Sequence, residues 1–600
     1  MAGPFSSPSG FRLPRNAVPY ALLLVLLAFL GAALIYPILL TLRGAFYDDV
    51  AARSGFTLNN LAMVFQDPVL REGLLNSFKV ATGTTLLAML IGVPLAVLAT
   101  RCNFPGKPVF NALILVPLIL PPFVGAIGFK MILGREGAMN TLLEQVGVLP
   151  ALRGIGLLAE GQPIDILGDA RFWGVIVVQA LSLYPIIFLN TTAALANLDP
   201  ALDEAAENLG AGFAKRLVRI TLPLIRPGLF AGGTIVFIWS FTELGTPLVF
   251  DFNRVTPVQI FLGLKEVESS SQPYALTLIM LVLAVGLYVA GKTLFGGRAY
   301  AMYAKASRAS QEERLTGIKG LAAAGAFGLV CGLALLPHLG VILTALAEPG
   351  SWYRSVLPTA FTGAHFHEAL THPDAYGAIR NSLILASCAV LLDVVIGILV
   401  GYLIVRTHIK GRGLLDALCM LPLAVPGLVM AFGYVAVSLQ WPFGKGDPLE
   451  GLVSVVGAEP NPIPLLIIAY AVRRLPYIVR ATVAGLEQTS GQMEEAALNL
   501  GASTFTAVRR IIVPLIAANL IAGALLAFSF AMLEVSDSLI LAQQQQHYPI
   551  TKAIYTFTGR LADGPSIASA MGVWGMALLT ITLVGASVLL GKKLGAIFRV

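Results

Sequence analysis

The chain has 600 residues, of which 56% are hydrophobic and 12% charged, and its mean hydropathy is +0.80. So little polar surface excludes a soluble protein of this length and predicts an all-α polytopic membrane protein, with the lipid bilayer as its main surroundings. The net charge of +7 could indicate a nucleic-acid partner, but the distribution of the charges favours membrane topology instead, and we expect no nucleic acid to bind.

Apolar runs of about 20 residues, long enough to cross a hydrocarbon core of about 30 Å, recur along the whole chain. The first is too long for the core of a signal peptide and lacks a cleavage site of small residues, so we expect it to remain as a span. The four cysteines are scattered and predict neither a disulfide nor a metal site. In chain order the twelve predicted spans are 18–42, 74–100, 109–132, 172–194, 227–250, 274–295, 318–346, 381–405, 414–439, 463–485, 518–542 and 567–591.

The spans repeat as six plus six. PLILPP from Pro117 matches PLAVPG from Pro422 at an offset of 305 residues, and beyond the third span the offset falls to 291. The first repeat therefore has 14 more residues, which we place in a long polar segment, roughly 134 to 171, that forms an external loop or small cap. An even number of spans gives both repeats the same orientation. The predicted organisation is a tail at 1–17, a first repeat at 18–296, a linker at 297–317 and a second repeat at 318–600.

One short motif occurs once in each repeat, after the fourth span. EAAENLG begins at Glu204 and EAALNLG at Glu495, and an isoleucine and a proline follow both at the same spacing. The alanines give a helix a narrow face that another surface can approach closely, and the acidic first turn suits the positive end of the helix dipole. Gly210 and Gly501 stand where such a helix would end in a left-handed residue. One copy would suit an ordinary loop helix, but two copies in register favour a function.

The basic residues indicate on which side the motifs lie. If the N-terminus is cytoplasmic, lysine and arginine exceed the acids on the side that has both motifs, and the other side has a slight acidic excess. Because basic loops stay on the cytoplasmic side, we expect both termini and both motifs there.

The repeated motif, with its downstream Ile and Leu-Pro, resembles the cytoplasmic EAA loop of permease subunits of ATP-binding-cassette (ABC) importers. Two copies in one twelve-span chain are similar to the fused permeases of the ferric-iron importer group, to which phosphonate, thiamine and polyamine permeases are related. The likeness covers about residues 60 to 590 and includes PLILPP, which in that group ends the first half of the third span. The second copy has Val513 where Leu222 precedes proline in the first.

The resemblance implies the type I importer fold, two parallel six-helix repeats in the bacterial inner membrane. It also implies that the two loops dock on a separate ATPase dimer that binds ATP and magnesium, and that an extracytoplasmic binding protein delivers the substrate. This chain would then have no catalytic residue and no cofactor of its own. The expected substrate is ferric iron, with 2-aminoethylphosphonate, thiamine or a polyamine as alternatives. The coupling residues implied are Glu204, Ala205, Ala206, Gly210, Glu495, Ala496, Ala497 and Gly501.

Gly286 to Thr293 has the sequence GLYVAGKT, a formal match to the phosphate-binding pattern GxxxxGK[ST]. That function requires a strand before the loop and a helix after it. Here the glycines lie at the inner end of an apolar span, where Lys292 would serve as an interfacial anchor. We therefore expect no nucleotide to bind to this chain.

Acids inside the spans are further candidates, because a carboxylate at the bilayer centre costs roughly 2.5 to 3.5 kcal/mol unless it faces water or a partner. Glu243 and Glu534 occupy equivalent positions in the fifth span of each repeat, and Asp537 lies almost one turn beyond Glu534. They would line the translocation pathway or its outer gate, or be hydrogen-bonded structural acids. Asp393 matches Ala88 and belongs to no symmetric site.

Two alternatives remain. His365, His367 and His372 cluster before the eighth span and would suit a metal, although histidines of a surface loop are commoner, and we predict no metal site. A secondary transporter can also be built from two six-span repeats, but it leaves the duplicated EAA loops unexplained.

Overall fold

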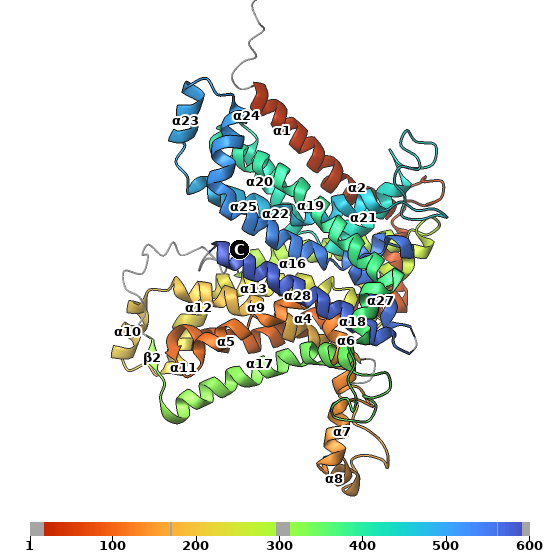
Figure 1. Ribbon diagram of the computed structural model, residues 1–600, viewed down its shortest axis with the longest axis vertical. Helices are drawn as coiled ribbons and strands as arrows, with labels where there is room; N and C mark the ends of the chain where they lie inside the picture. Colours follow the sequence, from red (N-terminus) through yellow and green to blue (C-terminus); the bar gives the residue numbers. More distant parts are fainter. Residues whose placement is uncertain (1–16, 168–170, 296–311, 561, 591–600) are drawn as a thin grey trace, which may run out of the picture.

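The computed structural model describes residues 17–167, 171–295, 312–560 and 562–590. Within these residues the chain is helical apart from two short strands, β1 (Cys102–Asn103) and β2 (Glu313–Arg314), which pair in parallel. The predicted all-α class is confirmed (Figure 1). The predicted tail at 1–17, apart from Ala17, and most of the linker at 297–317 lie outside the described residues.

The first repeat begins with α1 (Ala17–Leu30), which a π-helical turn joins to α2 (Tyr36–Gly44). Its other long helices are α4 (Pro68–Arg101), α6 (Pro122–Leu133), α9 (Phe172–Ala196), α13 (Arg226–Phe241) and α16 (Gln272–Phe295). The shorter ones are α3 (Asn59–Gln66), α5 (Lys107–Leu113), α7 (Ala138–Gln145), α8 (Val148–Gly154), α10 (Pro200–Asn208), α11 (Phe213–Arg216), α12 (Leu222–Leu224), α14 (Gly245–Val249) and α15 (Thr256–Gly263).

The second repeat follows the same order. Its long helices are α17 (Gly317–Leu346), α19 (Pro373–Arg406), α21 (Gly427–Leu439), α22 (Ile463–Glu487), α25 (Val513–Met532) and α28 (Gly564–Leu590). The shorter ones are α18 (Ala364–Thr371), α20 (Arg412–Met420), α23 (Gln492–Asn499), α24 (Thr504–Ala507), α26 (Ser536–Leu541) and α27 (Ile550–Thr558).

The helices that can span a membrane differ in number from the prediction. Among the described residues, eight helices are long and apolar enough by themselves, and three bent pairs would add one span each, which makes up to eleven rather than twelve. The helix at the predicted span 463–485, α22, is long enough but has too many charges to count as a span by itself, because it contains Arg473, Arg474 and Arg480. It nevertheless packs against α19 and α25 as α9 packs against α4 and α13. The six-plus-six arrangement of the helices is therefore retained.

Two predicted spans are not straight. The segments at 109–132 and 414–439 bend by 100° and 104° at PLILPP and PLAVPG. Pro121 and Pro426 cannot donate a backbone hydrogen bond, and each disfavours a helical residue before it, so the apolar run continues but the helix does not. Two further spans, 227–250 and 518–542, are also interrupted, because α13 and α25 end at Phe241 and Met532 before α14 and α26 begin.

The first helix of each repeat packs on the other repeat. The segment α1–α2 lies against α19, α20 and α21, whereas α17 lies against α5 and α6. Both crossings use glycines at equivalent positions: Gly128 meets the α17 backbone at Gly340, Gly433 meets α2 at Pro37, and neither has room for a Cβ. Small residues allow helix backbones in a membrane to approach closely. The exchange joins the two repeats into one body.

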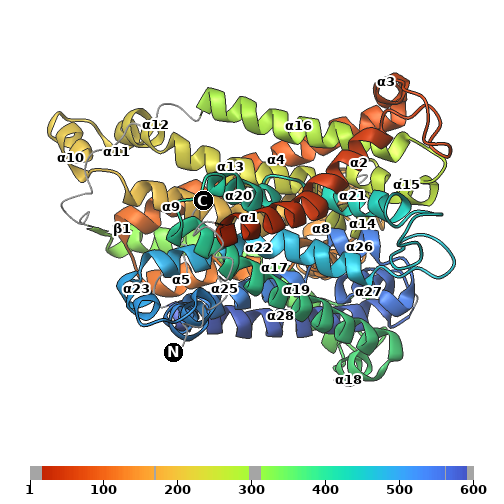
Figure 2. The same cartoon turned by 90° about the horizontal axis from the view of Figure 1, so that it is seen from above.

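The two motif helices, α10 and α23, lie at one end of the molecule (Figures 1 and 2). An even number of spans in each repeat predicts this arrangement. The GLYVAGKT segment lies inside the continuous helix α16, with no strand before it. A phosphate-binding loop is therefore excluded there. The side chain of Lys292 lies outside the described residues.

The described part of the segment from 134 to 171 forms a small cap with two helices, α7 and α8. Our prediction that it is polar is wrong for most of its length, because between residues 138 and 159 the only charged side chains are Glu144 and Arg153.

Candidate coupling loops and translocation pathway

The helix of each motif ends as the sequence predicts. Gly210 has φ +78° and Gly501 has φ +90°, so both are left-handed. The N–H groups of Ala211 and Ala502 donate to the carbonyls of Ala206 and Ala497, each at 3.0 Å. This is the Schellman arrangement, which satisfies carbonyls at a helix end. The two loops therefore have the same backbone design.

An ion pair fixes each motif helix to the second span of its own repeat. Arg101, at the end of α4, is 3.2 Å from Asp203 on α10, and Arg406, at the end of α19, is 3.5 Å from Glu494 on α23. Tyr402 also donates to Glu494 at 2.8 Å. Asp203 and Glu494 are equivalent and precede the motif glutamates by one residue. Sequence analysis did not single them out, although both pairs of residues match between the repeats.

The motif residues divide between two faces. Glu204, Ala205, Glu495 and Ala496 are exposed, whereas Ala206 is buried and Ala497 half-buried against its own chain. The motif helices also expose large apolar side chains at equivalent positions. At the ends of the two helices, Leu209 is 88% exposed and Leu500 is 89% exposed. In their first turns, Leu202 and Met493 are also exposed. Each loop thus presents an apolar surface that this chain does not cover.

In the second repeat, the predicted pathway acids are buried beside two arginines. Glu534 is 4% exposed and lies in the break after α25, and Asp537 is 1% exposed in the first turn of α26. From α22, Arg473 lies 3.3 Å from Glu534 and 3.8 Å from Asp537, and Arg474 forms an ion pair with Glu534. We call these four side chains the charged cluster.

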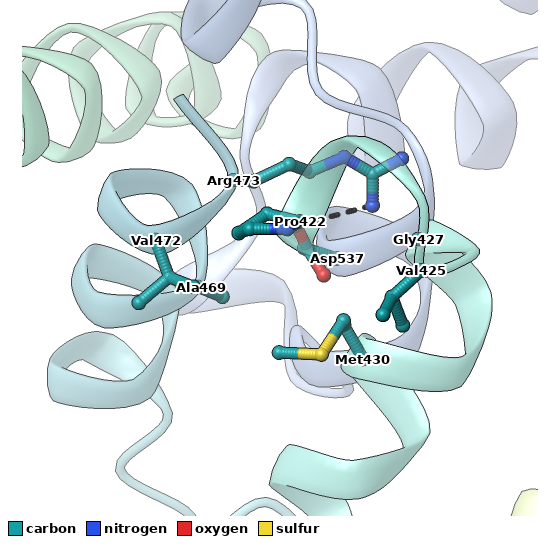
Figure 3. A pocket seen from close by; sticks show the side chains of 8 residues that line it. All are labelled: Pro422, Val425, Gly427, Met430, Ala469, Val472, Arg473 and Asp537. Atoms are coloured by element: carbon teal, nitrogen blue, oxygen red, sulfur yellow. Dashed lines mark ion pairs between the residues drawn. The ribbon is translucent and has the colours of Figure 1, made fainter. Parts of the chain in front are cut away.

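The charged cluster borders a narrow pocket at the bend between α20 and α21. Figure 3 shows Arg473 and Asp537 facing each other, beside Val425 and Met430. The Arg473 guanidinium occupies the place that a Cβ on Gly427 would need. Neither carboxylate oxygen of Asp537 accepts a hydrogen bond in the described structure. Asp537 is therefore held only by the rather long ion pair with Arg473.

The equivalent place in the first repeat has a different chemistry. Glu243 lies in the break after α13, and its Oε1 accepts hydrogen bonds from the backbone N–H of Thr246 at 3.2 Å and from its hydroxyl at 3.4 Å. Ser182 and Leu183 stand at the positions of Arg473 and Arg474. No ion pair with Glu243 is formed by the residues that the structure describes. Its carboxylate caps the short helix α14 instead.

The arginines of the charged cluster were missed at the sequence level. They are adjacent in the predicted span 463–485, and two cations inside an apolar run are as unfavourable as the acids that we singled out. The two adjacent arginines therefore indicated a buried partner of opposite charge.

Asp393 is fully buried on α19, and neither of its oxygens accepts a hydrogen bond in the described structure.

The three histidines before the eighth span have separate partners. His365 is buried, with its Nε2 3.1 Å from the carbonyl of Ala347, and the ring of His372 accepts the N–H of Asp374 at the start of α19. His367 lies near Thr371, one turn further along α18. No group of three or more potential metal ligands is found among the described residues.

Comparison with known proteins identifies the architecture. The family model described as "Binding-protein-dependent transport system inner membrane component" matches residues 88–291 and 393–591, one match in each repeat and most of the chain together. The chain belongs to this family. It is therefore a multi-pass inner-membrane permease with the type I ABC importer fold, one component of a binding-protein-dependent system, and it is not itself catalytic.

Two curated relatives resemble this permease over most of its length. A putative ferric transport system permease of Haemophilus influenzae is 26% identical over 87% of this chain and 77% of its own. A ferric transport system permease of Actinobacillus pleuropneumoniae is also 26% identical, over 85% of this chain and 69% of its own. Among solved structures, a bacterial ABC transporter for import of alginate aligns with a TM-score of 0.38 at 16% identity, over 47% of this chain and 96% of its own.

Proposed function

We propose that this permease forms the pathway for ferric iron and is driven by a separate ATPase dimer that docks on its two motif loops. The observation that supports coupling is the duplicated loop itself. Each loop has a motif helix fixed by an arginine–carboxylate pair, ended by a left-handed glycine and bearing an exposed leucine, Leu209 or Leu500. A dimer of identical ATPase subunits has two equal docking places, which two equal loops fit.

The loops and both termini lie in the cytoplasm in this proposal, because the excess of basic residues falls on that side. ATP and magnesium bind to the ATPase subunits, and the extracytoplasmic binding protein delivers the substrate to the opposite face. Glu204, Ala205, Glu495 and Ala496 point outward and contact the ATPase. Ala206 and Ala497 instead hold the helix against its own chain.

The substrate proposal has two supports. Two relatives, each 26% identical to this chain, are named as ferric transport permeases. The three acids of the fifth spans, Glu243, Glu534 and Asp537, outnumber the two arginines of the charged cluster, and carboxylate-lined pathways favour cations. A phosphonate is the second candidate, because guanidinium groups bind phosphoryl oxygens well and Arg473 Nη1 has no hydrogen-bond partner in the described structure.

The charged cluster closes the pathway in this arrangement. Its ion pairs join α22 to the segment after α25, and Arg473 also fills the bend of the third span of the second repeat. For a cation to pass between the carboxylates, Arg473 must leave Asp537. ATP-driven movement of the loops switches the pathway between a closed arrangement, in which Arg473 pairs with Asp537, and an open one, in which the two are apart.

Reconstitution tests the proposal. The permease is placed in vesicles with its ATPase inside, and the binding protein is added outside with radioactive ferric iron. We expect ATP-dependent iron uptake that needs the binding protein. Parallel assays with 2-aminoethylphosphonate, thiamine and a polyamine discriminate the substrates. Uptake of one of these without iron uptake would overturn the ferric assignment, whereas uptake without the ATPase would favour a secondary transporter.

A further inference from the structure

The cap in the first repeat differs from the other connections of the molecule. Helices α7 and α8 leave the end of α6, on the side of the molecule opposite α10 and α23, and they project sideways from the outer ends of α6 and α17 (Figure 1). We call residues 138–159 the lateral hairpin. The equivalent connection in the second repeat, 440–462, contains no helix and extends beyond the helix ends (Figure 2).

The two charged groups of the lateral hairpin pair with each other, and its buried amide is bonded to the neighbouring backbone. Its two charged side chains, Glu144 and Arg153, form an ion pair at 2.8 Å, and Arg153 also donates to the carbonyl of Gln162. Asn140 is 4% exposed, and its amide exchanges hydrogen bonds with the backbone of Ile164 at 2.8 and 3.0 Å. These contacts fix the hairpin as an ordered unit.

The exterior of the lateral hairpin is apolar. Large side chains point outward from both helices and from the turn that follows α8: Leu142 is 39% exposed, Val146 61%, Val148 40%, Ile155 70% and Leu157 70%. No charged residue other than the internal pair lies between 138 and 159. The 440–462 connection, by contrast, contains four charged residues: Lys445, Asp447, Glu450 and Glu459.

We propose that the lateral hairpin lies in the lipid–water interface of the outer leaflet, with its apolar side chains at the boundary of the acyl chains. Short amphipathic helices that lie at the level of span ends bind membranes in this way. The sideways direction of the hairpin places it over lipid. The paired Glu144 and Arg153 allow both charges to lie at that depth, because neither is left without a partner.

A membrane partner fits better than a protein partner. A binding protein approaches the permease from outside along the direction of the spans, where 440–462 extends. Between 138 and 159 only Glu144 and Gln145 have exposed polar side chains, whereas surfaces that bind proteins reversibly are rimmed by many polar and charged groups. The proposal does not depend on the substrate or on the docking of the ATPase.

Spin labels on the full-length permease in phosphatidylcholine–phosphatidylglycerol vesicles test the proposal. Val146→Cys and Ile155→Cys are labelled in a Cys388→Ala background, because the other three cysteines are buried. Both sites are exposed, so the labels do not disturb packing. Collisions of the label are measured with oxygen, which concentrates in lipid, and with a water-soluble nickel complex. Leu391→Cys, on an exposed face of the span α19, gives the lipid reference, and Glu450→Cys gives the water reference.

We expect the ratio of oxygen to nickel collisions at residues 146 and 155 to exceed one, as at the lipid reference, and to stay unchanged when the binding protein is added. A ratio below one at both sites, as at the water reference, would overturn the proposal. It would also be overturned if the nickel complex reached both labels until the binding protein shielded them, because the hairpin would then be a protein-docking element.

Discussion

The two repeats are alike at the end that bears the motif loops and unlike around the acids of their fifth spans. At the loops, each feature of the first repeat has a counterpart in the second, including the ion pairs Arg101–Asp203 and Arg406–Glu494. In the fifth spans, Glu243 caps a short helix, whereas Glu534 binds two arginines that the first repeat does not have. In the proposed complex the chain contacts two ATPase subunits but has only one substrate path. Duplication must therefore be preserved at the loops, while the surroundings of the acids are free to diverge.

The largest expected effect concerns the two equivalent glutamates. Glu534→Gln leaves Arg473 and Arg474 with too little compensating charge, and removing one partner of a buried ion pair costs about 3 to 5 kcal/mol. Glu243→Gln removes a helix cap and should cost at most about 1 kcal/mol. Thermal unfolding of the two variants in the same detergent measures the difference. Equal losses of stability would contradict the asymmetry around the two acids.

The next effect concerns the exposed leucines of the loops. Leu209→Glu and Leu500→Glu each place a charge in an apolar contact, and the loss should be about 2 kcal/mol or more, roughly 30-fold in Kd for the ATPase. The effects should match because the loops match. Leu357→Glu, at an exposed leucine outside both loops, is the control. If one loop variant binds the ATPase normally, the loops are not equivalent.

Smaller effects are expected at the helix ends. Gly210→Ala and Gly501→Ala impose a left-handed conformation on a residue with a Cβ, which costs about 1 to 2 kcal/mol. A Cβ would meet nothing within 4 Å at either site, so backbone strain is the only cause. Gly212→Ala is the matched control, because Gly212 has an ordinary φ of −65° and equal space. ATPase binding should fall severalfold in the first two variants and remain normal in the control.

The smallest effects are expected at the ion pairs of the loops. Asp203→Asn should loosen α10 by about 0.2 to 1 kcal/mol, the usual range for a pair that water reaches. Glu494→Gln should have a larger effect on α23, because the Glu494 side chain is only 10% exposed and also accepts from Tyr402. Hydrogen exchange of the two loops measures both. If exchange stays slow in both variants, the ion pairs do not fix the helices.

Features that depend on residues close together in the sequence could be predicted, whereas those that depend on contacts between distant residues could not. The repeat, the motif helices and the left-handed glycines depend on spacing within a few residues, and the structure has them where predicted. The charged cluster depends on contacts such as Arg474–Glu534, whose residues are 60 positions apart, and an apolar run does not tell which way its helix faces. The break at PLILPP was implied only by the resemblance to importer permeases, because apolar residues continue on both sides of Pro121 and of Pro426.

The lateral hairpin was misjudged for a related reason. The charged residues at its two ends suggested a polar loop, although residues 138–159 between them are mostly apolar. Average composition over a long segment concealed this contrast. The internal use of Asn140, Glu144 and Arg153 became evident only from their partners.

The central claim is that both loops bind ATPase subunits in the same way. Native mass spectrometry of the complex, purified through the permease with Leu209→Glu, with Leu500→Glu and with both changes, tests it most directly. We predict two ATPase copies per permease in the parental complex, equal partial loss in the two single variants, and none in the double variant with the permease still folded. Two ATPase copies retained by the double variant would contradict the claim, and so would loss confined to one of the single variants.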